Sequence, residues 1–430
     1  MGQPHEGARE GCGTANGCVV VESRKPRLEQ PAKLWVFVAA FCVLATACTS
    51  VIADAESDTG SDHIGEQTSD ESDESAASPS SATTIIEDYP DAIVRELQRQ
   101  MRAPRPVPNS ALPPRHIDAE RFPELLVERH LIVSGGPPPD GIRSIDTPTW
   151  LSIPQVDWLA DDESILVVSG EKTTHLYPTQ IMLWHEIVND VIDDHPITVT
   201  YCPLCNSAVA FDRRLGQRVL EFGTSGALYH SALVMYDRQT ESLWTHFDGR
   251  SIVGDLMGSE LELVPVQTMS WSQATQRWPD ALVLDRPTGE LGRRPYGISP
   301  YSSYEGMDEP LPGFFQGELD PRLPPRQRVV GLAIDGEAVA IDRRLVERNV
   351  TTSIEVSGRT IRLEHSVGVR SPLDGREVAE GVDIGSISAV ALGDDGSPDQ
   401  PVPVLDTFWF AWAAYHPNTA VLNRDGLREP

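Results

Sequence analysis

The sequence predicts an α+β, mostly β protein with two tandem related modules of short strands and a few helices. The chain has 430 residues, and its 35 prolines and 33 glycines divide it into short pieces that favour strands and turns over long helices. From about Arg121 to Arg428, valine, isoleucine, leucine and tryptophan recur steadily, enough for one large or two small cores. Similarity between two parts of this region predicts the two modules.

The similarity is clearest between residues 265–284, PVQTMSWSQATQRWPDALVL, and residues 403–422, PVLDTFWFAWAAYHPNTAVL. The two stretches align without gaps, and their prolines and their first tryptophan coincide. More weakly, the strand-turn-strand patterns around Gly170 and Gly336 resemble each other. The alternative to duplication is a chance similarity between two helix ends.

A duplication divides the folded part of the chain into three pieces. The first module spans 160–286 and the second 327–424, with a connector at 287–326 rich in proline, glycine and tyrosine. Residues 93–159 form an N-terminal extension that we expect to pack on the core.

The N-terminal residues 1–48 predict export. Residues 24–33, RKPRLEQPAK, carry four basic residues, and the uncharged run LWVFVAAFCVLATAC follows from Leu34 to Cys48. A basic region followed by an apolar region of this length is typical of a signal peptide. Small residues before Cys48 resemble a bacterial lipoprotein cleavage site, with Cys48 as the lipidated residue.

A second interpretation is an uncleaved membrane anchor. If the apolar stretch continues through Ala53, it reaches about 20 residues, which can span a bilayer. The basic flank would then stay inside. Both interpretations predict an extracytoplasmic protein attached to the cell membrane through its N-terminus.

Residues 49–92 predict an extended acidic tether. The stretch 54–91 is rich in Asp, Glu and Ser and has no Lys or Arg, so it cannot pack a core. The tether contributes much of the formal net charge of -29. Because nucleic acid requires a concentrated basic face, we expect no nucleic-acid partner.

One long helix is predicted, over residues 178–194, PTQIMLWHEIVNDVIDD. It begins with a proline suited to the first helical turn, and its apolar residues recur at helical spacing. His185 and Asn189 would then lie one turn apart on the same face. Residues 197–201 alternate like a half-buried strand that leads into CPLC, and residues 208–223 predict a hairpin with a turn at Gly216.

Cys202 and Cys205 are the only cysteines in the folded part, and three chemistries compete for them. A redox pair would ordinarily place its first cysteine at a helix N-terminus, whereas the residues after Cys205 predict a strand. A disulfide across two residues closes too small a loop to stabilise much. A Cys-Pro-x-Cys turn between strands is also the knuckle of zinc ribbons, which directs both sulfurs at one ion.

A metal site needs further ligands, and no second cysteine pair exists, so histidines would have to complete it. The module contains five: His175, His185, His195, His230 and His246. Soft thiolates favour zinc or cuprous copper. In the second module, the place of CPLC is taken by IRLEHSVGVRS, without cysteine, so the pair is interpreted as an added site and not as part of the scaffold.

Four stretches, in order, resemble domain-of-unknown-function family 3179 of bacteria and archaea over roughly residues 130–345. They are SGGPPPDGIRSID at 134–146, HEIVND at 185–190, VTYCPLC followed by AVAFDR at 199–213, and FGTSGALYHSALVMYDRQTESLW at 222–244. The resemblance implies export but no particular activity. By this resemblance, the motif residues of the family correspond in this chain to His185, Asn189, Asp190, Cys202, Pro203, Cys205, Tyr236, Asp237 and Trp244.

The chain departs from the family pattern at Asn206, at His230 and at His246. Those departures make His185 the preferred third ligand. The leading hypothesis is therefore a protein that binds or handles a soft metal ion, Zn or Cu, with Cys202, Cys205 and His185 as ligands. Asn189 and Asp190 would orient them, with the Asp190 carboxylate behind the site.

Two other functions compete with metal binding. The enzyme hypothesis is an extracytoplasmic thiol oxidoreductase that uses Cys202 as the attacking thiolate and Cys205 as its partner. The third hypothesis is a non-catalytic envelope module that binds a protein or a glycan. Substrate, reaction and oligomeric state do not follow from the sequence.

Overall fold

The computed structural model describes residues 18–19, 126–289, 291–393, 395–424 and 426–428, which all belong to one compact unit. The predicted signal peptide or anchor with Cys48, the acidic tether and residues 93–125 lie outside the described residues, apart from Cys18–Val19. No helix in the described ranges is long and apolar enough to cross a membrane.

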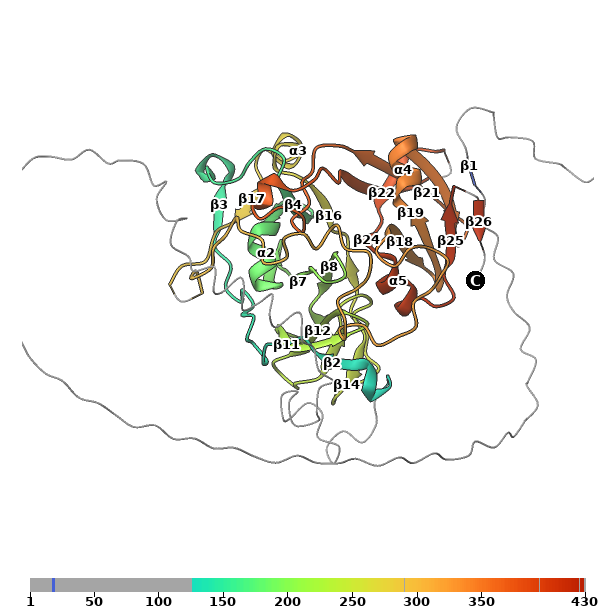
Figure 1. The fold of residues 1–430 in the computed structure, drawn as a ribbon. Helices are drawn as coiled ribbons and strands as arrows, with labels where there is room; N and C mark the ends of the chain where they lie inside the picture. The colour runs from blue at the N-terminus through green and yellow to red at the C-terminus, as the bar shows by residue number, and fades with distance from the viewer. Residues whose placement is uncertain (1–17, 20–125, 290, 394, 425, 429–430) are drawn as a thin grey trace, which may run out of the picture. The chain divides into compact units, whose positions relative to one another are not determined.

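The prediction of a mostly β, α+β protein is confirmed. The described strands form six sheets, accompanied by four seven-residue α-helices (Figure 1). The helices are α2 (Thr179–His185), α3 (Trp271–Arg277), α4 (Arg343–Asn349) and α5 (Trp409–Tyr415). Short 3-10 turns lie at η1 (Arg129–Leu131), η2 (Ile153–Gln155) and η3 (Val378–Glu380).

Two sheets contain most of the first predicted module. One has the order β16-β4-β5-β17-β3, with β3 (Trp150–Ser152), β4 (Ser164–Ser169), β5 (Thr174–Pro178), β16 (Gln267–Ser270) and β17 (Leu282–Leu284). The other has the order β15-β8-β7-β6, with β6 (Ile187–Ile192), β7 (His195–Cys202), β8 (Ser207–Asp212) and β15 (Leu263–Val264). Helix α2 links β5 to β6, and α3 links β16 to β17.

Two further sheets hold the second module in the same arrangement. Their orders are β24-β18-β19-β25-β26 and β1-β20-β21-β22-β23. The strands are β1 (Cys18–Val19), β18 (Arg328–Ile334), β19 (Glu337–Asp342), β20 (Thr351–Val356), β21 (Arg359–Ser366), β22 (Ser386–Leu392), β23 (Pro398–Pro401), β24 (Leu405–Phe408), β25 (Ala420–Asn423) and β26 (Gly426–Arg428).

The two modules share strand directions as well as strand order. In each, a central hairpin (β4 with β5, β18 with β19) is antiparallel, and its second strand pairs in parallel with the last strand of the module. A short helix then leads into a second hairpin, β6 with β7 or β20 with β21. Duplication of one module stays a prediction, which this common topology favours.

A fifth large sheet is inserted between β8 and β15 of the first module. Its order is β14-β13-β12-β11-β2, with β2 (Ile132–Ser134), β11 (Phe222–Tyr229), β12 (Ala232–Asp237), β13 (Leu243–Thr245) and β14 (Ser251–Val253). A small hairpin of β9 (Arg214–Leu215) and β10 (Arg218–Val219) precedes it, with the predicted turn at Gly216. The segment FGTSG forms the start of β11, where the pairing with β12 shifts between Thr224 and Ala227.

The predicted long helix over 178–194 is wrong in its second half. Helix α2 ends at His185, Glu186 adopts a φ of 57°, and residues 187–192 form strand β6. The β-branched residues of IVNDVI fit a strand, and Asp193 and Asp194 form the positive-φ turn that joins β6 to β7. Ile187 and Val188, which point to opposite faces of this strand, are both buried, whereas Val191 is exposed.

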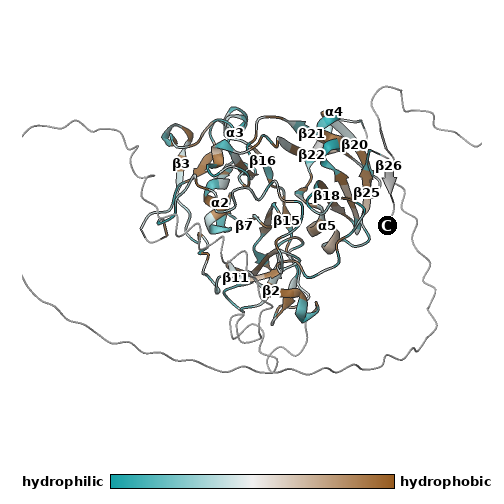
Figure 2. Ribbon diagram, viewed as in Figure 1, coloured by the Kyte–Doolittle hydropathy of each residue, from teal (hydrophilic) through white to brown (hydrophobic). Residues whose placement is uncertain are grey.

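The main hydrophobic core is continuous between the modules. One cluster of buried residues includes Trp184, Cys202 and Cys205 of the first module and Phe408 and Trp412 of the second. Figure 2 shows the hydrophobic residues concentrated on the strands, with hydrophilic residues on many of the connecting segments. The cysteines therefore lie inside the largest core and not at its edge.

Gly226 in β11 lies against the backbone of the Pro137 segment. Its φ is 75°, and an added Cβ would lie 2.0 Å from the carbonyl oxygen of Pro137. We expect Gly226→Ala to lower the free energy of unfolding by about 2–4 kcal/mol, because backbone strain and a backbone clash add. Gly216 is the matched control: its φ is 61°, but no atom lies within 4 Å of the place that a Cβ would take.

The measurement is urea unfolding followed by tryptophan fluorescence. Gly216→Ala shares the backbone strain without the clash, and we expect it to cost about 1 kcal/mol. Equal losses in the two variants would contradict the close approach of β11 to the Pro137 segment.

Candidate functional site

The four residues Cys202–Cys205 form the tight turn between β7 and β8. Cys202 is paired with Ser207 at the end of the ladder, and the N–H of Asn206 donates to the carbonyl of Pro203 at 3.3 Å. Both cysteines are free thiols, and both are buried. The predicted strand, turn and strand around CPLC are confirmed.

Backbone donors converge on the sulfur of Cys202. The N–H of Leu233, from β12, donates to Sγ at 3.3 Å, and the N–H groups of Leu204 and Cys205 also donate to it. Burial alone would raise the pKa of Cys202, but the hydrogen bonds from the Cys205 thiol and from these backbone groups leave its pKa below the ordinary value. Donors of this kind stabilise the thiolate.

Cys205 lies in the opposite environment. Burial, its hydrogen bond to Cys202 and the charge of Cys202 raise the pKa of Cys205 well above the usual value. Its Sγ also contacts the hydroxyl of Ser207 at 3.0 Å. The pair is therefore asymmetric, with Cys202 as the group that ionises and Cys205 as the group that remains a thiol.

A chain of hydrogen bonds explains why Cys205 keeps its proton. Thr200 donates to the carbonyl of Val209 at 2.9 Å, so the Thr200 oxygen accepts the Nδ1–H of His246, also at 2.9 Å. Nε2 of His246 is then the acceptor for Ser207 at 2.7 Å. With its own proton engaged by His246, the Ser207 hydroxyl cannot donate to Cys205, so it does not stabilise a thiolate there.

His246 is neutral in this chain. Burial lowers its pKa to about 3, so the imidazole stays uncharged above acidic pH. A neutral His246 fixes the direction of the hydrogen bonds from Thr200 to Ser207. No pattern in the sequence links His246 to the cysteines, since it follows Cys205 by 41 positions on an inserted sheet.

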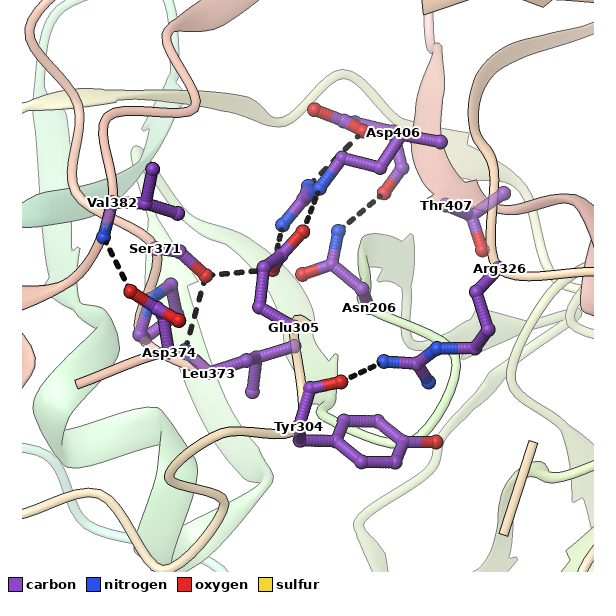
Figure 3. Close-up of polar contacts among 12 residues, drawn as sticks. Asn206, Tyr304, Glu305, Arg326, Ser371, Leu373, Asp374, Val382, Asp406 and Thr407 are labelled. Atoms are coloured by element: carbon purple, nitrogen blue, oxygen red, sulfur yellow. Dashed lines mark hydrogen bonds and ion pairs between the residues drawn. The ribbon is translucent and has the colours of Figure 1, made fainter. Parts of the chain in front are cut away.

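The turn is clamped by the connector and the second module. Tyr304 donates its hydroxyl to the carbonyl of Leu204 at 2.7 Å, and Thr407 donates to the carbonyl of Cys205 at 2.6 Å. Asn206 donates to the carbonyl of Asp406 at 3.3 Å. Figure 3 shows Tyr304, Asp406 and Thr407 around Asn206.

An ionic network lies beneath this clamp. Arg328 binds both oxygens of Glu305, at 2.7 and 2.6 Å. Ser371 also donates to Glu305, at 2.7 Å (Figure 3). Arg328 also reaches Asp406 at 3.3 Å. Because Glu305 follows Tyr304 in the chain and Asp406 precedes Thr407, the network holds both halves of the clamp.

A small pocket lies beside the turn at Leu204, and neither cysteine lines it. Its volume is about 40 Å³, and its lining is mainly apolar, with Leu204 and Leu233 from the two sides of the thiol. Three polar side chains also line it, Glu186, Thr224 and Tyr301. Burial and the charge of the nearby Cys202 raise the pKa of Glu186 well above its usual range.

His185 does not join the cysteines. Its Nδ1 contacts the carbonyl of Arg143 at 2.7 Å, and its Nε2 contacts the hydroxyl of Tyr296 at 2.7 Å. Burial lowers the pKa of His185 to about 4. Both ring nitrogens are therefore engaged, and the histidine fixes the end of α2 to neighbouring segments.

Asn189 and Asp190 also lie on other contacts. Asn189 bridges Asp146 and the backbone of Phe222. Asp190 accepts from Tyr177 at 2.6 Å and contacts His175 at 2.7 Å. Both residues therefore tie β6 to neighbouring segments of the fold.

The remaining predicted residues occupy separate places. His195 is exposed beside Arg214, and His230 lies in the turn between β11 and β12. Tyr236 contacts Asp140, while buried Asp237 accepts from the indole of Trp244 at 2.9 Å. Nowhere in the described part of the chain do three or more His, Cys, Asp or Glu side chains gather to hold a metal ion.

The sequence identified the two thiols but not the groups that shift their pKa values. Glu186 stands inside the HEIVND motif, and Ser207 follows CPLC closely, yet their proximity to Cys202 and Cys205 depends on the β6–β7–β8 pairing. With β6 recognised as a strand, its register would have placed Glu186 across from Tyr201. No motif or spacing in the sequence indicates that Leu233, Tyr301 or Thr407 lies near the two cysteines.

The sequence model of the family described as "Protein of unknown function (DUF3179)" matches residues 139–419, which cover the first module and all but the last five residues of the second. No curated protein and no solved structure matches the chain.

Proposed function

The chain belongs to the DUF3179 family of proteins of unknown function, and we propose that it is a thiol oxidoreductase in which Cys202 attacks and Cys205 resolves. The observation that carries this proposal is the asymmetry of two adjacent buried thiols. Three N–H groups donate to the sulfur of Cys202, whereas Cys205 contacts the oxygen of a serine whose proton is engaged by His246.

The asymmetry fits the two steps of a dithiol reaction. First, the Cys202 thiolate attacks an electrophilic atom of the oxidant, forms a bond to it and releases a reduced leaving group. Next, the Cys205 sulfur attacks Cys202, the adduct departs, and the proton of Cys205 leaves with it. The dithiol loses two electrons and two protons, and the oxidant gains them.

The fold supports this chemistry without a helix N-terminus. In thioredoxin-like motifs a helix lowers the pKa of the first cysteine. Here the pKa of Cys202 is lowered by the N–H groups of Leu204 and Cys205 in the turn and by the N–H of Leu233 in the inserted sheet. The absence of CPLC from the second module agrees with a site added to one copy of a common scaffold.

A membrane-attached location outside the cytoplasm belongs to the same proposal. The basic and apolar N-terminal residues, with Cys48 as lipidated residue or an uncleaved anchor, support it. Oxidising compartments of this kind favour disulfide formation. Soft-metal binding by Cys202 and Cys205 stays a separate prediction, but it would need ligands other than His185, whose ring nitrogens are engaged.

We expect Cys202 and Cys205 to form a reversible disulfide. The full chain would be equilibrated in buffers of oxidised and reduced dithiothreitol, quenched with acid, alkylated and mapped by mass spectrometry. The expected result is one cooperative two-electron transition in the peptide that holds both cysteines, absent in Cys202→Ser and in Cys205→Ser.

Two results would overturn the proposal. One is a Cys202–Cys205 pair that stays reduced at every ratio, although unfolded protein oxidises readily. The other is stoichiometric metal in protein purified without chelator that is lost in the double variant Cys202→Ser/Cys205→Ser, because a bound metal would occupy the thiolate.

A further inference from the structure

The two modules share a feature at the edge of their second hairpins. In the first module, strand β6 receives one more segment on the side away from β7, where Ile145 forms a parallel bridge with Val188. The N–H of Ile145 donates to the carbonyl of Ile187 at 2.9 Å, and its carbonyl accepts from the N–H of Asn189 at 2.9 Å. A segment that precedes the first module therefore closes the edge of β6.

The second module has the same acceptor edge on β20. Strand β20, like β6, begins directly after a positive-φ residue. Its first and third residues, Thr351 and Ser353, therefore correspond to the two that bind Ile145. On this side β20 pairs in parallel with β1, and Cys18 lies opposite Ser353. Both modules thus accept a parallel segment at the same edge.

The opposite edge of this sheet is closed to further strands. Strand β23 begins and ends with a proline, Pro398 and Pro401, and its pairing with β22 is irregular. Prolines and bulges are the usual means by which proteins protect a sheet edge. Strand β20, with the sequence TTSIEV, has neither proline nor lysine, and Val350 at its start is 60% exposed. A strand can therefore be added at β20 but not at β23.

The proposed export removes the occupant of this edge. Cys18 precedes the uncharged apolar run that begins at Leu34. A cleaved signal peptide takes Cys18 away, and an uncleaved anchor keeps it on the inner side of the membrane, with the modules on the outer side. In both cases β1 cannot pair with β20 in the exported protein. The edge then presents unpaired N–H and C=O groups, which are a template for another strand.

We propose that the β20 edge of the exported protein binds an extended segment of a partner protein, which adds in parallel as a further strand of the sheet. The residues that occupy the two edges in the structure, Cys18, Val19 and Ile145, are uncharged, and two of the three are β-branched. An uncharged, β-branched segment therefore fits. The inference rests on the export in the proposed function and does not depend on the thiol chemistry.

Two other occupants fit this edge less well. A second copy of β20 would pair antiparallel across a twofold axis, whereas both modules accept parallel segments. The tether of residues 49–92 is rich in Asp and Glu, and β20 itself carries Glu355. Like charges on adjacent strands are destabilising. The chain's formal net charge of -29 disfavours any other acidic segment as well.

The test introduces a thiol into this edge. Full-length Ser353→Cys protein would be exported by a bacterial host, extracted and mixed with the capped peptide ANGCVVV, residues 15–21 of this chain, activated at its cysteine as a thiopyridyl disulfide. In a parallel pair the peptide cysteine lies opposite position 353, and adjacent strands about 4.8 Å apart allow a disulfide. Mass spectrometry would identify the joined cysteines and follow the rate.

We expect this peptide to react with the new thiol at least about tenfold faster than a peptide with Val19→Pro, because proline removes a backbone donor from the added strand. Ser397→Cys is the matched control, an exposed position next to the proline-protected strand β23. Its thiol should react with both peptides at the same rate. Iodoacetamide would show that the thiols at the two positions are equally accessible.

The other outcomes overturn the inference. Equal rates with the two peptides at position 353 would mean that no strand is added. A disulfide between the new thiols of two chains would assign the edge to a second copy. A new thiol that neither the peptide nor iodoacetamide reaches would mean that the chain covers its own edge. A disulfide from Cys18 to the new thiol in exported protein would show that β1 stays in place, and would refute the proposed topology too.

Failure of this inference is distinguishable from failure of the proposed oxidoreductase. The dithiothreitol titration reports only on Cys202 and Cys205, which lie in a different sheet from β20. A reversible disulfide with no peptide selectivity would leave the oxidoreductase without the docking edge. Peptide selectivity without a reversible disulfide would leave the docking edge alone.

Discussion

Replacing Glu305 by glutamine is expected to lower the free energy of unfolding by about 3 kcal/mol at neutral pH. The substitution leaves Arg328 with a buried positive charge and only the longer contact to Asp406 at 3.3 Å. The side chains of Arg328 and Glu305 are 10% and 14% exposed, so water cannot compensate for the lost carboxylate. Removing one partner of a buried ion pair lowers the free energy of unfolding far more than removing an exposed pair does.

The pH dependence of this loss has a definite sign. Burial would raise the pKa of Glu305, but Arg328, Ser371 and Arg326 outweigh it and lower the pKa to about 2, against 4.5 for an ordinary glutamate. A depressed folded pKa contributes stability above the unfolded pKa. That contribution is lost as the pH falls from about 4.5 through about 2.

The measurement is urea unfolding of wild-type protein and of Glu305→Gln at pH 7, 4 and 3. We expect the difference between them to shrink as the pH falls, because protonation removes from the wild type what the mutation removes from the variant. Glu309→Gln, at an exposed position of the same connector, should differ from wild type by less than about 0.5 kcal/mol at every pH. A difference that stays constant with pH would contradict the Glu305–Arg328 assignment.

The second large effect concerns the reactivity of the two thiols. In Cys205→Ser, the remaining Cys202 should react with iodoacetamide at pH 7 at least about 100-fold faster than Cys205 does in Cys202→Ser. The reason is the thiolate fraction, since backbone N–H groups lower the pKa of Cys202, whereas burial raises the pKa of Cys205 even after Cys202 has been replaced. Serine at 205 retains a hydroxyl that can still donate to Cys202.

Both thiols are buried, so access to the reagent needs its own control. Repeating the reaction in guanidinium chloride exposes both sulfurs, and the two rates should then agree within about twofold. A pH series from about 6 to about 10 should show the rate of Cys202 levelling off at lower pH than that of Cys205. Similar rates for the two folded variants would contradict the asymmetry on which the proposed oxidoreductase rests.

The fold class could be predicted because the sequence patterns that favour short strands and turns agree with the tertiary contacts of the folded chain. Prolines and glycines that break the chain, alternation in residues 197–201 and the turn at Gly216 all reappear as short strands and turns. The helix over 178–194 is wrong in part because apolar spacing in a short segment suits a strand buried on both faces as well as a helix. The Asp193–Asp194 turn was the local signal that could have decided it.

The candidate site was predictable to the level of the two cysteines. Residue type, spacing and the strand on each side identified Cys202 and Cys205, and the motif order identified the family. The sequence favours His185 as a third ligand because it is close along the chain and lies in a recognisable motif. In the folded chain its ring nitrogens face Arg143 and Tyr296, which are 42 and 111 positions away.

The sequence by itself determined a mostly β chain with a Cys-Pro-Leu-Cys turn between two strands, because those features depend on neighbours along the chain. Tertiary structure alone decided what the turn can do, because its chemistry comes from groups far away in sequence. The N–H of Leu233, 31 positions further along the chain, donates to the sulfur of Cys202. Ser207 connects the sulfur of Cys205 to His246, which lies 39 positions after Ser207. Thr407 holds the turn from 202 positions away. A thiol's ionisation depends on the donors and acceptors within a few ångströms, and only the folded chain brings them there.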